Sequence, residues 1–259
     1  MNFMVYALIG IHSESRFYDY YKVVDKLDKT HFKYLVTGDS HANAVWRRGD
    51  NPDVLDMTFP GDNQVDINKK IAFLKINGIS YDAHLYQADE HILTSYRERA
   101  NNNDLSSNFD SRIFWIKTRK LLPLFTDPRV GESILNKFRG NKGEDEENKP
   151  ENSVVDTSNM EQRCKVQYNT SFSNKMMNYI RRNLTVEAES NTPVVLIHYP
   201  LYGPYFELVR KTETFENLQD SLSLVEEQAK LEQLDYIQAI CSPNSFSDQD
   251  HLNTKGAKL

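Results

Sequence analysis

The sequence has little cysteine and no excess of positive charge. Its two cysteines, Cys164 and Cys241, lie far apart, so no disulfide framework and no zinc site of Cys-x-x-Cys pairs can be drawn. Each is expected to be a small neutral side chain. Lysine and arginine number 31 against 37 acidic residues, which gives a formal net charge of -6 at pH 7. Because nucleic-acid binding depends on clustered positive charge, this balance argues against a nucleic-acid partner.

Long apolar runs are also missing. Residues 1–11, MNFMVYALIGI, have no basic segment in front and fall short of the roughly 20 apolar residues that span a bilayer. Two interpretations of the lead-in at residues 1–30 stay open. In the first, its apolar part is a structural element, and a cytoplasmic protein is predicted. In the second, it is the remnant of a longer membrane anchor, and only then is a membrane contact predicted. No feature of the sequence predicts the oligomeric state.

The turn after the first expected strand lacks the glycine-rich fingerprint of phosphate-binding loops. A nucleotide or phosphate binder is therefore the least favoured class, and no cofactor is predicted. His84, Asp89 and His91 could be drawn as metal ligands, but His84 lies in an expected strand and the other two follow in the loop beyond it. A packed or solvated role is favoured for all three, and no metal site is predicted.

The sequence does contain alternating apolar strands and helices. Helical patterns lie at residues 65–76, which end at a typical Asn77-Gly78 stop, at 111–125 and at 217–234. Such alternation predicts right-handed crossovers and a parallel sheet. We therefore expect an α/β fold, a three-layer α/β/α sandwich of about five strands of the flavodoxin-like, doubly wound kind. The expected strands are residues 31–37, 54–59, 81–87, 193–199 and 235–240.

One long stretch does not fit this alternation. We interpret residues of about 90–190 as an insertion in a single domain that spans residues 31–259, because the sheet needs strands from both sides of it. Within the insertion, residues 140–160 are polar, acidic and almost free of large apolar groups. Such a segment cannot bury enough surface to offset the entropy of ordering it, so a mobile surface loop is predicted there.

Two short motifs could carry chemistry. Gly38-Asp39-Ser40 follows the first expected strand, and Asp248-x-x-His251 follows the last. A serine hydroxyl is a poor nucleophile unless a base takes its proton and a third group orients that base. The three-residue spacing lets Asp248 reach Nδ1 of His251 while Nε2 faces outwards. The alternative for Gly38-Asp39-Ser40 is an ordinary turn, for which these residue types are typical.

These motifs, together with the phrase DHLNTKGA at residues 250–257, resemble the SGNH or GDSL hydrolase family. The resemblance is to the branch associated with O-acyl modification of bacterial polysaccharides and cell walls. It implies that Ser40 attacks an ester carbonyl, that His251 is the general base and that Asp248 orients it. His41, directly after the serine, is expected to point away from the nucleophile.

The resemblance also implies an oxyanion hole. The second sequence block of the SGNH family supplies a glycine after the second strand, which here is Gly61 in FPGDN. Its N–H would stabilise the oxyanion together with the N–H of Ser40. The third block usually supplies an asparagine, but here the strand runs into LYQADEH, so Gln87 is the expected substitute. Loss of one oxyanion donor typically costs about 10²–10³ in turnover. His198 and Tyr202 lie after the fourth strand and are expected to line the substrate pocket, with packing as the alternative.

The predicted function is a serine-dependent acyl-ester hydrolase or O-acetyltransferase that acts on a carbohydrate or polysaccharide through an acyl-serine. Its expected partner is an acylated carbohydrate or a small ester. The resemblance implies a location on the periplasmic face or at a membrane anchor. The alternative is a catalytically weak module of the same fold that binds a polysaccharide or a partner of an assembly machine, which the absent third-block asparagine favours.

Overall fold

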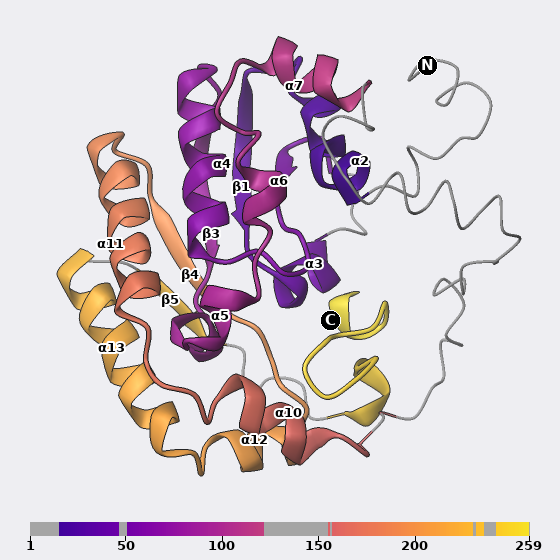
Figure 1. Ribbon diagram of the computed structural model, residues 1–259, viewed down its shortest axis with the longest axis vertical. Coiled ribbons are helices and arrows are strands. Elements are labelled where there is room, and N and C mark those ends of the chain that lie inside the picture. Colours follow the sequence, from indigo (N-terminus) through magenta and orange to yellow (C-terminus); the bar gives the residue numbers. More distant parts are fainter. Residues whose placement is uncertain are drawn as a thin grey trace, which may run out of the picture.

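The computed structural model describes residues 16–46, 51–121, 155, 157–229, 232–235 and 242–258. In this part of the chain, five parallel strands form one sheet in the order β2-β1-β3-β4-β5 (Figure 1). This is the strand order of flavodoxin-like doubly wound folds, and it confirms the predicted parallel sheet. The strands are β1 (His31–Thr37), β2 (Val54–Asp56), β3 (Ser80–Gln87), β4 (Val194–His198) and β5 (Glu232–Asp235).

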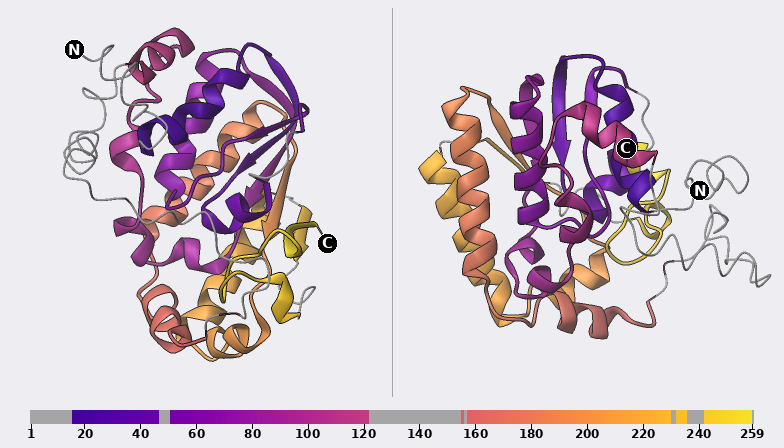
Figure 2. Two further views of the ribbon diagram at one scale, coloured as in Figure 1. Left: turned by 90° about the vertical axis from the view of Figure 1, so that its right-hand side faces the viewer. Right: turned by 45° about the horizontal axis from the view of Figure 1, so that its top comes forward.

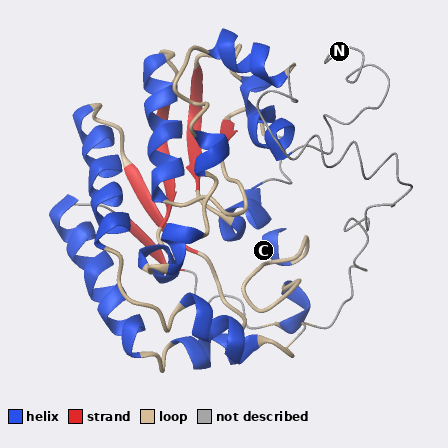
Figure 3. Ribbon diagram, viewed as in Figure 1, coloured by secondary structure: helices blue, strands red, loops and turns tan. Residues whose placement is uncertain are grey.

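Helices lie on both sides of the strands (Figure 3). On one face, α4 (Gln64–Ile76), α11 (Asn174–Glu189) and α13 (Glu213–Ala229) share an apolar cluster with β4. On the other face, α3 (Ser40–Trp46) packs on the sheet through a separate cluster. Right-handed crossovers explain this division, because the chain moves from β1 to β2 in one direction and through β3, β4 and β5 in the other. The predicted three-layer α/β/α sandwich is confirmed.

The helix α4 shows how local sequence fixes an element. Its N-cap is Asn63, whose side chain accepts hydrogen bonds from the N–H groups of Val65 and Asp66, while the Asp66 carboxylate accepts the N–H of Asn63. This reciprocal capping box satisfies N–H groups that have no partner within the helix. At the other end, Gly78 has a φ of 69°, the left-handed conformation that glycine adopts without strain. The predicted helix and its Asn77-Gly78 stop are confirmed.

Replacing Asn63 with alanine is expected to lower the free energy of unfolding by about 1 kcal/mol, because two N–H groups at the start of α4 lose their acceptor. Asn63→Ser, which restores a capping oxygen, should recover most of that loss. Chemical denaturation of both variants measures the difference. Equal stabilities of the two variants would contradict the capping role.

Two elements depart from the sequence prediction. The predicted strand 54–59 ends at Asp56, because the Asp56 carboxylate accepts both the N–H and the hydroxyl of Thr58 and turns the chain there. The predicted helix 217–234 starts and ends too far along the chain, because α13 covers Glu213–Ala229. Residues Glu232–Asp235 form the strand β5, which pairs with β4. Pairing with the sheet overrode a local helical pattern. Of the predicted strand 235–240, residues 236–240 lie outside the described residues.

The stretch predicted as an insertion, residues 90–190, contains part of the sandwich itself. Its last helix, α11, packs on α4 and is the crossover from β3 to β4. The predicted helix 111–125 appears as Ile113–Lys120, and residues 122–125 lie outside the described residues. Most of the acidic stretch 140–160 also lies outside them, so its predicted mobility stays a prediction. The helix Ile113–Lys120 is α7, and the other helices in the described part of this stretch are η3 (Glu90–Leu93), α5 (Tyr96–Arg99), α6 (Asn103–Ser106) and α10 (Met160–Gln167).

The described part of the lead-in belongs to the fold. It forms α2 (Arg16–Tyr21) and η2 (Lys22–Lys26), and Tyr21 and Val24 are fully buried in a cluster with residues of β1 and β2. Residues 1–15 lie outside the described residues. Among the helices that the structure describes, none combines the length and the apolar character that crossing a bilayer requires.

The remaining elements close the carboxyl edge of the sheet. They are α12 (Gly203–Val209), η5 (Pro243–Ser245) and η6 (Gly256–Lys258). The C-terminal segment lies beside α3 in both views of Figure 2, and η6 contacts α3. The two sequence motifs, one after the first strand and one after the last, therefore lie at the same edge of the sheet.

Candidate active site

The turn that carries Ser40 is built around a glycine. Gly38 follows β1 with a φ of 158°, and an added Cβ would lie 2.4 Å from Oε1 of Gln87 and 2.6 Å from Cβ of Ala42. Only glycine fits this close approach. It lets the chain leave the strand and begin α3 at once, so that Ser40, the first residue of α3, sits partly exposed at the carboxyl edge of the sheet.

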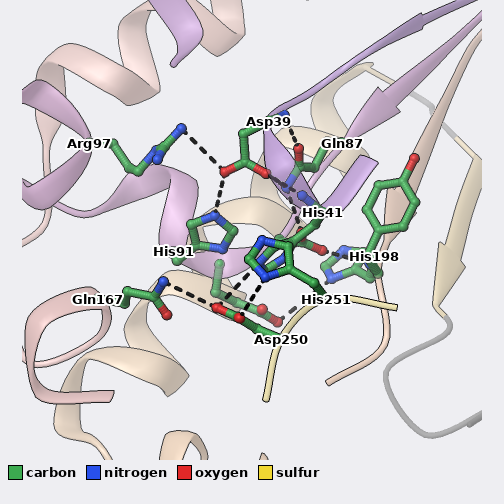
Figure 4. A network of polar contacts seen from close by, with 12 residues as sticks. Asp39, His41, Gln87, His91, Arg97, Gln167, His198, Asp250 and His251 are labelled. Atoms are coloured by element: carbon green, nitrogen blue, oxygen red, sulfur yellow. Dashed lines mark hydrogen bonds and ion pairs between the residues drawn. The ribbon is translucent and has the colours of Figure 1, made fainter. Parts of the chain in front are cut away.

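Asp39, between Gly38 and Ser40, is buried and fixes the turn through its carboxylate. Its Oδ1 accepts the side-chain amide of Gln87 at 2.9 Å, and its Oδ2 accepts Nε2 of His91 at 2.9 Å and lies 3.2 Å from Nη2 of Arg97 (Figure 4). Burial alone would raise the pKa of Asp39, but the charges of His91 and Arg97 hold it well below its usual range. The aspartate of the motif therefore fixes the turn and stays ionised.

The second motif has the local geometry that its spacing predicts. Nδ1 of His251 lies 2.9 Å from both carboxylate oxygens of Asp248, and the backbone N–H of His251 donates to Asp248 Oδ1 at 2.9 Å. Nε2 is buried and has no hydrogen-bond partner among the described residues. Burial would lower the pKa of His251, but hydrogen bonds to Asp248 and Asp250 raise it to about 9.

The two motifs meet through His41. Its ring packs edge to face on the ring of His251, with centroids 5.2 Å apart, and its Nε2 lies 3.5 Å from Oδ2 of Asp250. Because His41 directly follows Ser40, the serine and the unpartnered Nε2 of His251 lie at the same edge. Among the described residues, no hydrogen bond joins the Ser40 hydroxyl to His251. Contacts of this kind are often long before substrate binds and tighten in the complex.

The loop after β2 carries Gly61 beside this turn. Two residues earlier, the N–H of Phe59 donates to the carbonyl of Gly38 at 3.2 Å. Gly61 has a φ of 90°, and the Asn102 amide would lie 3.4 Å from an added Cβ, so the position favours glycine. The loop is held at Asp62, which pairs with the buried Lys70 and accepts the Asn102 amide at 2.8 Å. No described residue accepts a hydrogen bond from the Gly61 N–H, and its role as an oxyanion donor stays a prediction.

The expected oxyanion role of Gln87 needs correction. Its amide nitrogen donates to Asp39 Oδ1 at 2.9 Å and to Asp89 Oδ2 at 2.6 Å, and its oxygen accepts the N–H of Asp39 at 2.6 Å. Both amide hydrogens are therefore occupied, and the side chain is buried. Gln87 instead bridges the carboxylates of Asp39 and Asp89 and ties the end of β3 to the turn after β1.

The two expected substrate residues are found at the edge in different settings. His198 ends β4, is buried, and has Nδ1 3.7 Å from the Glu90 carboxylate. Tyr202 is partly buried, packs on the ring of Phe246, and donates its N–H to the carbonyl of Gln249 at 3.0 Å. Tyr202 thus braces the loop of His251. A role of either side chain in substrate binding stays a prediction.

Sequence reasoning missed most of the polar network around these motifs. His41, expected to point away from the nucleophile, is buried between Asp89, 2.9 Å from its Nδ1, and Asp250. His91, expected to be packed or solvated, is packed, and it binds Asp39. The only sign of this network in the sequence was the run of polar residues that follows β3. The network comprises Asp39, His41, Gln87, Asp89, His91, Arg97, Arg163, Gln167, Asp250 and His251.

Two groups in this network have ligand atoms within 4.8 Å of one another, as a metal site would need: Asp39, His41 and His91, and His41, Asp250 and His251. Their imidazole–carboxylate contacts already have hydrogen-bond lengths, such as 2.9 Å between His91 and Asp39. Arginines also share the carboxylates: Arg97 lies 3.2 Å from Asp39, and Arg163 lies 2.7 Å from Asp250. This donor set fits protons and guanidinium groups better than a divalent ion.

Comparison with known proteins adds little to this geometry. No family model matches the chain, and no curated protein matches it. Among solved structures, it is similar to the crystal structure of a "putative acylhydrolase" from Bacteroides fragilis. The two share 10% sequence identity and a TM-score of 0.38, over 89% of this chain and 82% of that chain. So distant a likeness leaves the function to be argued from the site.

Proposed function

We propose that the protein is a serine-dependent acyl-ester enzyme. Ser40 is the nucleophile, His251 is the general base, and Asp248 orients His251. One observation carries the proposal: Asp248 occupies Nδ1 of His251, and the buried Nε2, at the edge where α3 begins with Ser40, has no hydrogen-bond partner in the described part of the chain. A base held in this way has one nitrogen oriented and the other ready to accept a proton.

The chemistry follows from these positions. Nε2 of His251 takes the hydroxyl proton of Ser40 as Oγ bonds to the ester carbonyl carbon, and the resulting oxyanion is met by the N–H groups of Ser40 and Gly61. The proton then passes from His251 to the departing alkoxide as the C–O bond breaks, which leaves an acyl-serine. Water or a sugar hydroxyl, deprotonated by His251, attacks the acyl carbon. The bond from that carbon to Oγ then breaks, and His251 returns the proton to Ser40.

Two oxyanion donors are available in this scheme, because Gln87 is occupied by Asp39 and Asp89. A missing third donor lowers turnover by about 10²–10³ relative to a complete hole. Slow hydrolysis of small esters is therefore expected. The inference of a carbohydrate O-acyl substrate, and of O-acetyl transfer to a sugar as the alternative to hydrolysis, rests on the resemblance to the polysaccharide-linked branch of the SGNH family.

A fluorophosphonate probe tests the nucleophile. The full chain is expected to become covalently labelled at Ser40, because phosphonylation requires a serine activated by a base. Ser40→Ala should abolish labelling, whereas Ser247→Ala, at a partly buried serine in the same region, should retain it. Mass spectrometry of the intact protein and of its peptides identifies the site. Labelling that persists in Ser40→Ala would assign the nucleophile elsewhere and contradict the proposal.

The second candidate function is a catalytically weak module that binds a polysaccharide or a protein of an assembly machine. The occupied amide of Gln87 favours it, since the third oxyanion donor is missing. If a folded wild-type chain is not labelled, this function is the better explanation. Calorimetric titration with O-acetylated and de-acetylated forms of one polysaccharide would then test binding.

A further inference from the structure

Two carboxylates, rather than one, meet the imidazole of His251. Nδ1 is hydrogen-bonded to Oδ1 of Asp248 at 2.9 Å, and it makes an ion-pair contact of 3.1 Å with Oδ1 of Asp250. Their surroundings differ: the Asp248 side chain is 29% exposed, whereas the Asp250 side chain is 0% exposed. A buried charge is retained only where other groups compensate for its lost hydration, so the partners of Asp250 decide its role.

Those partners come from two other elements. From α10, Arg163 binds both oxygens of Asp250, with Nε 2.9 Å from Oδ2 and Nη2 2.7 Å from Oδ1. Gln167, one helical turn further along α10, donates its amide to Oδ2 at 3.2 Å. A two-pronged guanidinium–carboxylate contact fixes orientation as well as charge. Figure 4 shows Asp250 between Gln167 and the imidazole rings.

From α3, His41 reaches Asp250 on the opposite side. Its Nε2 lies 3.5 Å from Asp250 Oδ2, and its Nδ1 lies 2.9 Å from Asp89 Oδ2. Burial would lower the pKa of His41, but hydrogen bonds to Asp250 and Asp89 raise it well above its usual value. Burial would likewise raise the pKa of Asp250, yet hydrogen bonds from His251 and His41 hold it well below the usual range. Both shifts favour the charged forms, an imidazolium for His41 and a carboxylate for Asp250.

We propose that Asp250 is a second positioning carboxylate of the active site, whose charge acts together with that of Asp248 on the Nδ1 side of His251. Through Arg163 and His41 it also ties the loop of His251 (residues 246–252) to α10 and α3. This inference rests on the function proposed above and deepens it. Asp248 supplies the local contact dictated by spacing, and Asp250 supplies a charge that water does not screen.

The charged groups that face His251 come from three elements. Its own loop contributes Asp248 and Asp250, α3 contributes His41, and α10 contributes Arg163, whose Nη1 is 4.0 Å from Asp248 Oδ2. The carboxylates favour the protonated ring, and the two cations oppose it. Further groups act through contacts with His41, namely Asp39, Asp89 and His91.

The test uses Asp250→Asn, which keeps the shape of the side chain and removes its charge. Loss of a nearby opposite charge should lower the pKa of His251 by about 1–3 units. NMR titration of the His251 ring measures this shift in a Ser40→Ala background, where labelling plays no part. In the chain with Ser40 intact, the pH at half-maximal rate of fluorophosphonate labelling should fall with it. Asp220→Asn, at an exposed position of α13, is the matched control and should change neither.

The presence of two carboxylate charges beside Nδ1 predicts a second result. Asp248→Asn should slow labelling by far less than the about 10⁴-fold loss that follows removal of the lone triad carboxylate of a serine protease. The double variant Asp248→Asn/Asp250→Asn should lose more than the sum of the single losses in free energy, because each carboxylate covers for the other. Asp250→Glu, which keeps the charge, should restore a raised pKa of His251.

Three outcomes would overturn the inference. Asp250→Asn could fold and leave the His251 titration unchanged, or Asp248→Asn alone could abolish labelling as completely as His251→Ala. If Asp250→Asn does not fold, Arg163→Gln tests the same contact in the other direction: removal of the cation should raise the pKa of His251, and an unchanged pKa would refute the link. Absence of labelling in the wild type would refute the enzymatic function, whereas the NMR titration would still decide the role of Asp250.

Discussion

Replacement of His251 with alanine is expected to slow fluorophosphonate labelling of Ser40 by about 10⁴–10⁶-fold, the range found when a base or its orienting group is removed from a serine triad. The physical reason is the proposed role of His251 as the base: its Nε2 has no hydrogen-bond partner among the described residues, and its loop lies at the edge where α3 begins with Ser40. His41 cannot replace it, because Asp89 and Asp250 occupy its two nitrogens. The measurement is the second-order rate constant of labelling on the full chain.

The same experiment has a pH dependence with a defined sign. Only neutral His251 accepts a proton, and its pKa is raised to about 9. Labelling should therefore increase with pH and level off above about 9, and each unit below that value should cost roughly tenfold. His31→Ala is the control, because His31 is exposed at the opposite end of β1 and pairs with Asp82. Two results would contradict the role of His251. One is a wild-type labelling rate in His251→Ala, and the other is a labelling rate that stays constant between about pH 6 and 9.

The largest loss of stability is expected from Glu187→Gln. Glu187 lies in α11 with a fully buried carboxylate, which accepts the Tyr81 hydroxyl at 2.6 Å and Nδ1 of His84 at 3.0 Å on Oε1, and Lys75 Nζ at 3.0 Å on Oε2. His84 in turn contacts the hydroxyl of Thr37 at 2.8 Å, so the cluster joins α11, α4, β3 and β1. Removing one partner of a buried ion pair leaves the others without compensation, and we expect a loss of about 3–5 kcal/mol.

The acid sensitivity of this cluster follows from the pKa of Glu187. Burial would raise that pKa, but hydrogen bonds from His84, Tyr81 and Lys75 lower it from 4.5 to about 2. A depressed pKa contributes stability that is complete above the unfolded value and is lost as the pH falls toward the folded one. Wild-type protein should therefore lose this contribution between about pH 4.5 and 2, whereas Glu187→Gln should not.

Denaturant unfolding at neutral and acidic pH measures both effects. Glu189→Gln is the matched control, because Glu189 lies two positions further along α11 and is exposed. That variant should unfold as the wild type does. If Glu187→Gln were as stable as Glu189→Gln at neutral pH, the buried cluster would not contribute to the fold in the way described.

Much of the architecture follows from local patterns. The stop at Asn77-Gly78 and the apolar positions before it define α4 to within one residue, because caps and periodicity act over a few neighbouring residues. The start of β5 could not be predicted in this way. Residues 232–234 continue a helical pattern, and only their pairing with β4 makes them a strand.

Some features of the site could likewise be predicted from local sequence, and others could not. The pairing of Asp248 with His251 depends on a spacing of three residues, and the motif glycine Gly38 is needed at a turn whose position the strand pattern predicts. Gln87 shows the limit of such reasoning. Its amide was a reasonable oxyanion donor by residue type, but the neighbours that occupy it, Asp39 and Asp89, are known only once β1 and β3 lie side by side.

The sequence by itself determined a parallel α/β sandwich whose connections bring Gly38-Asp39-Ser40 and Asp248-x-x-His251 to one edge of the sheet, since strand period, crossover handedness and short-range spacing are local properties. Only the tertiary structure decided which charges surround the imidazole. Arg163 and Asp250 are 87 positions apart, and His41 meets both Asp89 and Asp250 across separate elements. Contacts between distant residues depend on how helices and loops pack, and no pattern within a few residues encodes them.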